Sequence, residues 1–145
     1  MQVENNDGDE LMIDGGCLCR AVRYRSSVAP VTTRLCWCRV CQYIGAGSAT
    51  FNAVFKREGF SFSGDLVDYR SIADSGTVMH RRFCPHCGTH LFSEAESRLH
   101  LIIVRVGTLD KPHAFKPAAT IWTSSAPTWA SIDLDLPHFS GQPPP

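Results

Sequence analysis

The sequence predicts a single, mainly β domain that metal ions hold together. Three observations support this fold class. Apolar and polar residues alternate over several short segments, no stretch of ten or more residues has the 3.6-residue period of a helix, and all seven cysteines fall in three tight clusters. The length of 145 residues suits one domain, and the sequence contains neither internal repeats nor a linker.

The charge balance argues against several classes of partner. The chain has 14 basic and 14 acidic side chains, whereas a nucleic-acid-binding protein normally carries a basic excess. No apolar run is long enough to span a bilayer. Residues 1–14 are acidic and polar and lack the apolar core of a signal peptide. We therefore expect a cytoplasmic protein that binds neither nucleic acid nor membranes.

The first expected elements surround the first cysteines. Gly15 and Gly16 predict a tight turn that folds around an ion. A strand is expected next, because Val22 and Tyr24 would lie on one of its faces and Arg23 on the other.

The rest of the chain continues with short strands. Residues 48–55 alternate well, and the run 100–106 is apolar on both faces, which predicts a central strand. A short helical turn or loop after the central cysteines would bring Cys38 and Cys41 together. Further strands are expected over residues 60–62, 77–83, 91–92 and 119–123.

The cysteine clusters carry the strongest functional signal. They are Cys17-Leu18-Cys19, the triplet Cys36-Trp37-Cys38-Arg39-Val40-Cys41, and Cys84-Pro85-His86-Cys87. In a reducing compartment, tight clusters favour metal binding or catalysis over disulfides. Seven is also an odd number, so a full disulfide scheme leaves one thiol over. Two zinc ions that share four and three thiols leave none.

Two groupings of the thiols fit the spacing. In the first, the two outer pairs close one tetrahedral zinc site, and the triplet holds a second zinc with a free fourth position. Gly88 would then provide the left-handed turn after the downstream pair. A closed zinc site contributes on the order of 10–16 kcal/mol of folding free energy, so we interpret it as structural. In the second grouping, the last two cysteines of the triplet join the downstream pair in a ribbon-like site.

The cysteine segments resemble those of the glutathione-dependent formaldehyde-activating enzyme family. The similar segments are Gly16-Cys17-Leu18-Cys19-Arg20-Ala21-Val22-Arg23-Tyr24, the triplet, Phe83-Cys84-Pro85-His86-Cys87-Gly88-Thr89, Val106-Gly107-Thr108-Leu109-Asp110, and Ile121-Trp122 to Trp129. The resemblance implies a domain over residues 13–139, between a flexible leader (1–12) and a flexible proline-rich tail (140–145). It implies several small curled β-sheets held by zinc, as in Rab-exchange-factor-like zinc proteins.

The resemblance also implies the first grouping of thiols and two zinc ions per chain. The structural zinc ligands would be Cys17, Cys19, Cys84 and Cys87, and the catalytic zinc ligands would be Cys36, Cys38 and Cys41. Many family members have His where Trp37 stands, and two basic residues where Gln42 and Tyr43 stand. We expect these changes to alter the pocket wall, and hence the substrate, without affecting the metal ligands.

Three thiolates on a divalent ion leave a net charge near −1, so this centre is a weak Lewis acid and hydrolysis is not the natural expectation. An incoming thiol can take the fourth position and lose its proton. The resemblance implies a carbon–sulfur lyase that condenses glutathione with formaldehyde to S-hydroxymethylglutathione. The expected partners are therefore a small thiol such as glutathione and a small aldehyde. The competing hypothesis is a non-catalytic, zinc-stabilised binding module, such as an exchange-factor-like chaperone or scaffold.

Other residues give weaker signals. Basic side chains that can meet the carboxylates of a glutathione-like anion are Arg39, Lys56, Arg81 and Arg82. Such residues more often lie on solvated strand faces. The flanking or titratable residues His86, His90, Glu94 and Glu96 have no assigned role, and Trp122 and Trp129 are expected in the core or the pocket wall.

Overall fold

The structure of the protein is a computed structural model that describes residues 11–144. The expected leader over residues 1–12 therefore lies almost entirely outside the described residues. The strands are β1 (Ile13–Gly16), β2 (Arg23–Ser26), β3 (Thr32–Cys36), β4 (Thr50–Lys56), β5 (Phe60–Ser63), β6 (Val67–Ile72), β7 (Val78–Phe83), β8 (His90–Ala95), β9 (Leu101–Arg105) and β10 (Ala119–Ile121). Within this range the one α-helix, α1 (Arg39–Ile44), has six residues. The mainly β prediction is confirmed.

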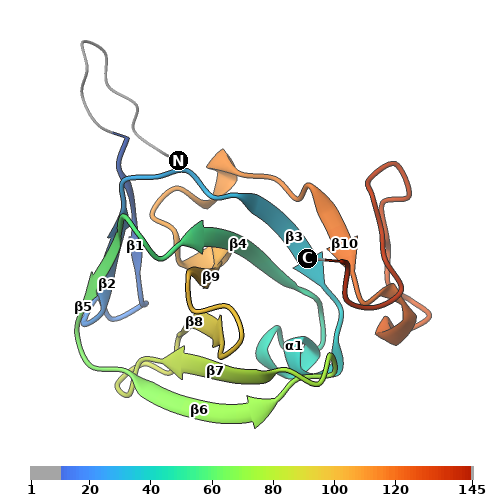
Figure 1. Cartoon of the computed structure of the whole chain (residues 1–145), viewed down its shortest axis with the longest axis horizontal. Helices are drawn as coiled ribbons and strands as arrows, with labels where there is room; N and C mark the ends of the chain where they lie inside the picture. Colours follow the sequence, from blue (N-terminus) through green and yellow to red (C-terminus); the bar gives the residue numbers. More distant parts are fainter. Residues whose placement is uncertain (1–10, 145) are drawn as a thin grey trace.

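The strands form two sheets (Figure 1). A three-stranded antiparallel sheet has the order β1-β2-β5, and a seven-stranded sheet has the order β10-β3-β4-β9-β8-β7-β6. The pairing of β10 with β3 is parallel, and the other pairs in the large sheet are antiparallel. The large sheet is so strongly curved that β3 and β4 lie across the molecule from β6 and β7 in Figure 1.

The main hydrophobic core lies between the two sheets. Tyr24 and Phe60 from the small sheet stack with ring centroids 5.4 Å apart, and both contact Phe92 of the large sheet edge-on. Tyr24 is only 3% exposed, and its hydroxyl lies 2.7 Å from the hydroxyl of Thr108. Burial raises the pKa of Tyr24, so its hydroxyl stays protonated in the core.

Strand β4 is buried on both faces, although its sequence predicts one buried face. Ala53 and Phe55 belong to the core, as the alternation predicts. Asn52 and Val54 point to the opposite, concave face of the large sheet and are also buried. This second face lines the cavity described below.

Most predicted strands are confirmed, with shifted ends. The prediction of a central strand over residues 100–106 corresponds to β9, which pairs with β4 and β8. The prediction of a tight turn at Gly15 and Gly16 is wrong, because both residues lie in strand β1. A Cβ at Gly15 would come 2.3 Å from the Tyr24 hydroxyl, so this glycine permits close packing against the core. Strands β1, β3 and β6 were not predicted.

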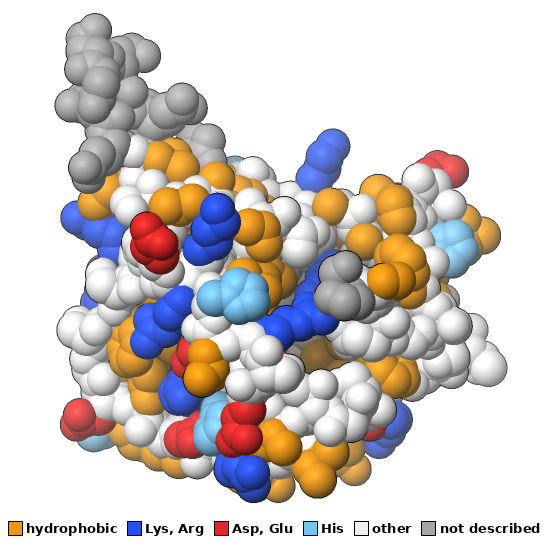
Figure 2. Space-filling view, in the orientation of Figure 1, with side chains coloured by type: hydrophobic (Ala, Val, Ile, Leu, Met, Phe, Trp, Pro, Cys, Tyr) orange, Lys and Arg blue, Asp and Glu red, His pale blue; other side chains and the backbone are white. Residues whose placement is uncertain are grey.

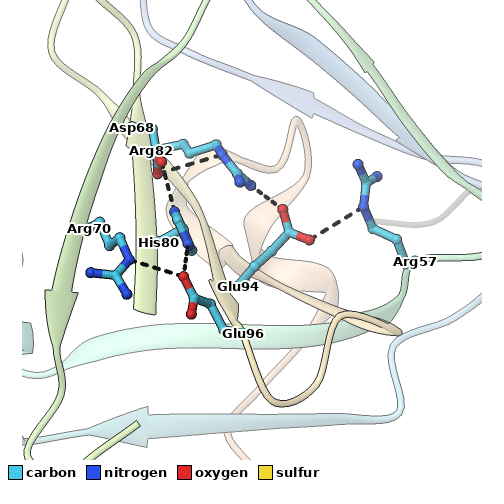
Figure 3. A network of polar contacts seen from close by, with 7 residues as sticks. All are labelled: Arg57, Asp68, Arg70, His80, Arg82, Glu94 and Glu96. Atoms are coloured by element: carbon cyan, nitrogen blue, oxygen red, sulfur yellow. Dashed lines mark hydrogen bonds and ion pairs between the residues drawn. The ribbon is translucent and has the colours of Figure 1, made fainter. Parts of the chain in front are cut away.

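The outer side of β6, β7 and β8 carries a network of ionic side chains (Figure 3). Its members are Arg57, Asp68, Arg70, His80, Arg82, Glu94 and Glu96. The Glu94 side chain is 7% exposed and contacts the guanidinium groups of both Arg82 and Arg57. The hydrogen bonds with Asp68 and Glu96 raise the pKa of His80. The network links the edge strand β6 to its neighbours in the sheet.

The last described residues run alongside β10. The Phe139 N–H donates to the Thr120 carbonyl at 3.0 Å, and the Trp122 N–H donates to the Gly141 carbonyl at 3.3 Å. The Trp122 ring N–H donates to Gln142 Oε1 at 3.1 Å. No helix in the described part of the chain is long and apolar enough to cross a membrane.

Candidate metal centres and the adjoining cavity

The outer cysteine pairs come from two turns that face each other. In the first turn, the Val22 N–H donates to Cys17 Sγ at 3.3 Å, and Arg20 adopts a left-handed φ of 68°. In the second turn, the His86 N–H donates to Cys84 Sγ at 3.4 Å. Gly88 has φ 74°, as predicted for the residue after this pair. Backbone N–H groups directed at sulfur favour the thiolate form that binds metals.

The four sulfurs fit a tetrahedral ion. The distance from Cys17 Sγ to Cys19 Sγ is 3.6 Å, and that from Cys19 Sγ to Cys84 Sγ is 3.7 Å. A tetrahedron with Zn–S distances of about 2.3 Å has edges of about 3.8 Å. Cys87 completes a group in which all sulfurs lie within 4.8 Å of one another. The hydrogen bond with the Thr89 hydroxyl lowers the pKa of Cys87 to about 5.

The triplet sits where β3 ends and α1 begins. Cys36 is the last residue of β3, and Cys38 is the N-cap of α1, whose Sγ accepts a hydrogen bond from the Cys41 N–H at 3.3 Å. This first helical turn brings Cys38 and Cys41 to the same side, as predicted. All three thiols are buried, and their sulfurs lie within 4.8 Å of one another. Among residues 11–144, no His, Asp or Glu joins this group.

The three thiols influence each other's ionisation. Hydrogen bonds with Cys36 and then Cys38 lower the pKa of Cys41, whereas hydrogen bonds with Cys38 and then Cys41 raise the pKa of Cys36. Negative charge within the triplet is therefore favoured on Cys41 over Cys36. Two separate groups of four and three soft thiol ligands suit zinc, and they match the first of the two groupings predicted from the sequence.

A cavity of about 190 Å³ adjoins the triplet on the concave face of the large sheet. All three triplet cysteines line it, and alternate residues of β3, β4, β7, β8 and β9 provide much of its wall. Cross-strand register places Arg34 opposite Asn52, and Asn52 opposite Arg105. Figure 2 shows basic side chains gathered around a recess near the middle of one face.

Arg105 is a charged residue buried in the wall of this cavity. It is 8% exposed, and its Nη1 and Nη2 groups donate to Asn52 Oδ1 at 2.6 Å and to Ser93 Oγ at 2.5 Å. Its Nε–H has no partner within residues 11–144. Burial lowers the pKa of Arg105, while the negative charge of Cys41 raises it. The guanidinium therefore has unused N–H donors beside the thiols.

The positions where this chain departs from the common family pattern do not line the cavity. The expectation that Trp37, Gln42 and Tyr43 alter the pocket wall is wrong. Gln42 is buried, and its Nε2 group donates to the carbonyls of Trp37 at 2.8 Å and Ser125 at 2.9 Å. These bonds fasten α1 to the turn after β10. Tyr43 is exposed and lies under the Arg39 guanidinium.

The residues with weaker sequence signals lie on two different sides of the large sheet. Arg81 and Trp122 line the cavity, whereas Arg82 and Glu94 pair with each other on the outer side of the sheet. The cavity is also lined by residues to which the sequence alone gave no role, among them Arg34, Arg98, Arg105 and Gln142. Arg34 and Arg105 follow the alternation of their strands toward the concave face. Sequence periodicity can indicate that face only once the pairing of β3, β4 and β9 is known.

Comparison with known proteins agrees with this arrangement. The family model described as glutathione-dependent formaldehyde-activating enzyme matches residues 12–125. Among solved structures, the crystal structure of a Rhodobacter sphaeroides protein is similar with a TM-score of 0.52 and 21% sequence identity, and the match covers 67% of this chain and 87% of that chain. At this level of identity, the likeness supports the fold alone. No curated protein gives a significant match.

Proposed function

Because the chain belongs to the glutathione-dependent formaldehyde-activating enzyme family, we propose that it is a zinc-dependent carbon–sulfur lyase. In the forward direction it would join a thiol such as glutathione to formaldehyde or a related small carbonyl compound. The observation that carries this proposal is the incomplete ligand set of the triplet, which opens onto a cavity, beside a separate group of four thiols. A site that only stabilises the fold would have no use for such a cavity.

The two cysteine groups would have different roles. Cys17, Cys19, Cys84 and Cys87 would hold a structural zinc, and Cys36, Cys38 and Cys41 would hold the reactive one. The reactive ion would offer a position for the sulfur of the entering thiol and lower the pKa of that thiol. The walls of the cavity would hold the carbonyl compound next to the sulfur and exclude bulk water.

The addition needs no reactant other than the thiol and the carbonyl compound. The sulfur lone pair forms the new S–C bond, and the electron pair of the carbonyl π bond moves to oxygen. Arg81 and Arg105 line the cavity, and their N–H groups would stabilise the negative charge on that oxygen. The proton lost by the thiol ends on the same oxygen and gives the hydroxymethyl product. The reverse sequence is the lyase reaction.

The test is formaldehyde consumption by purified, zinc-loaded protein in the presence of glutathione. We expect a rate above the spontaneous reaction in buffer, and a rate equal to buffer for the Cys38→Ser variant. S-methylglutathione, which has no free thiol, should give no consumption with the unaltered protein. A rate for the unaltered protein no higher than that of buffer would favour the alternative of a non-catalytic binding module.

A further inference from the structure

The cavity beside the triplet has an excess of positive charge. Four guanidinium groups line it, from Arg34, Arg81, Arg98 and Arg105. Asp74 is the one carboxylate among the lining residues, and its Oδ2 accepts the backbone N–H of Arg39 at 3.1 Å. For a chain with equal numbers of basic and acidic side chains, this is a local concentration of one sign.

These four arginines also differ from the arginines on the outer surface in their pairing. The outer arginines with carboxylate partners within 4.0 Å are Arg23, Arg25, Arg57, Arg70 and Arg82. None of the four cavity arginines has such a partner in the part of the chain that the structure describes. Arg81 donates to the Ser71 hydroxyl at 2.8 Å, and Arg105 donates to Asn52 and Ser93, so their partners are neutral.

The negative charge of the cysteine triplet is too small to neutralise all four guanidinium groups. Three thiolates with one divalent cation carry a net charge of about −1. Together with Asp74, this compensates about two of the four guanidinium groups. A buried guanidinium without a counter-charge is costly. Cys41 supplies a negative charge to Arg105, whereas Arg81 is 5% exposed and its partner is the neutral Ser71 hydroxyl, so Arg81 in particular calls for an anion in the cavity.

The size of the cavity indicates a compact anion. Its volume of about 190 Å³ lies below the roughly 300–1,000 Å³ of sites that enclose drug-sized ligands. A small carbonyl acid of a few heavy atoms suits this volume, whereas the whole glutathione tripeptide would extend outside it. The planar guanidinium fork matches a carboxylate through two parallel N–H···O bonds.

We propose that the arginine-lined cavity binds a carboxylate group of a reactant and holds it beside the cysteine triplet. The inference rests on the proposed function in one respect, since it takes the triplet as the place where thiol and carbonyl compound meet. The carboxylate belongs either to the carbonyl compound, which would then be an oxo acid, or to the thiol. Both sources share the same recognition chemistry.

The experiment measures binding rather than turnover. Isothermal titration calorimetry on the zinc-loaded protein at fixed ionic strength uses two probes, glyoxylate as a carbonyl acid and S-methylglutathione as a carboxylate-bearing molecule without a free thiol. The variants are Arg34→Met and Arg98→Met. Both positions are partly exposed, and neither substitution removes a side-chain hydrogen bond to another described residue. Arg70→Met, on the outer side of β6, is the matched control.

Loss of one guanidinium contact should weaken binding by about 10- to 100-fold in at least one cavity variant, with no change in the control. Arg-dependent binding of glyoxylate assigns the carboxylate to the carbonyl compound, and Arg-dependent binding of S-methylglutathione alone assigns it to the thiol. Binding of neither probe, or equal affinity in the cavity variants and the unaltered protein, overturns the inference. Anion binding without formaldehyde turnover would count against the proposed reaction alone, and turnover without anion binding would count against this inference alone.

Discussion

The division of the seven cysteines into two unequal groups predicts that equivalent substitutions have very different consequences. Cys84 is fully buried, lies 3.7 Å from Cys19 Sγ and accepts the His86 N–H. Cys84→Ser would remove one of four thiol ligands from a site that we propose holds zinc. Loss of such an ion withdraws on the order of 10–16 kcal/mol, against a typical net stability of about 5–15 kcal/mol. We therefore expect this variant to be unfolded.

Cys38→Ser should behave differently, because of the position of Cys38 in the fold. Its sulfur caps α1, and a serine hydroxyl at the same position also accepts the Cys41 N–H, since serine is among the preferred N-cap residues. The packing lost on replacing sulfur by oxygen is comparable to one buried methylene, about 0.8 kcal/mol. The variant should stay folded, lose one of two zinc equivalents and lose the proposed activity.

Circular dichroism, urea unfolding and elemental analysis of zinc per chain distinguish the two cases. Cys36→Ser, a second triplet variant at the end of β3, should resemble Cys38→Ser in metal content. If Cys38→Ser unfolds as completely as Cys84→Ser, the triplet is a structural site and the proposed chemistry is wrong. If Cys84→Ser keeps both its fold and its full metal content, the assignment of a structural zinc to the four outer cysteines is wrong.

Three further predictions concern stability. Gly15→Ala should lower the free energy of unfolding by about 1–3 kcal/mol in a urea titration, because its Cβ would come 2.3 Å from a buried tyrosine hydroxyl; an unchanged midpoint would contradict the close packing of the sheets. Glu94→Gln should lower the free energy of unfolding by about 1–3 kcal/mol, because two guanidinium groups lose their buried carboxylate partner. Glu96→Gln, at a side chain 42% exposed, should lower it by less than about 1 kcal/mol. Equal losses for the two variants would contradict this ranking. The pKa of His80 is raised above 6.5, first by Asp68 and then by Glu96, so its stabilising effect is complete below pH 6.5 and is lost as the pH rises through the raised value. Urea midpoints at a series of pH values should show this loss for the unaltered protein, and His80→Gln should not show it.

The sequence was most informative where a single chemical requirement dictates the local structure. The Cys38–Cys41 spacing predicts a helical turn because a metal needs both thiols on one side, and Gly88 predicts a left-handed turn for the same reason. The apolar run at β9 predicts a central strand because both of its faces are covered. In each case one physical cause decides the conformation.

The parts that were missed depend on neighbours that are distant in the chain. Strand β6 is mostly exposed, so it has no apolar face from which to predict it, and pairing with β7 and the ionic network holds it in the sheet. Arg105 ends a run of apolar residues and looks like a surface charge until the register with β4 and β8 places Asn52 and Ser93 beside it. Gln42 gains its role only when the turn at Ser125 folds back over α1.

The course of the last described residues has a practical consequence for anyone preparing this protein. Gln142 lines the cavity, and its Oε1 accepts the Trp122 ring N–H at 3.1 Å. A purification tag attached shortly after Gln142 would therefore begin close to the cavity wall, and a histidine tag would bring its own zinc ligands there. Purification handles belong at the opposite terminus, or should be cleaved before metal content or ligand binding is measured.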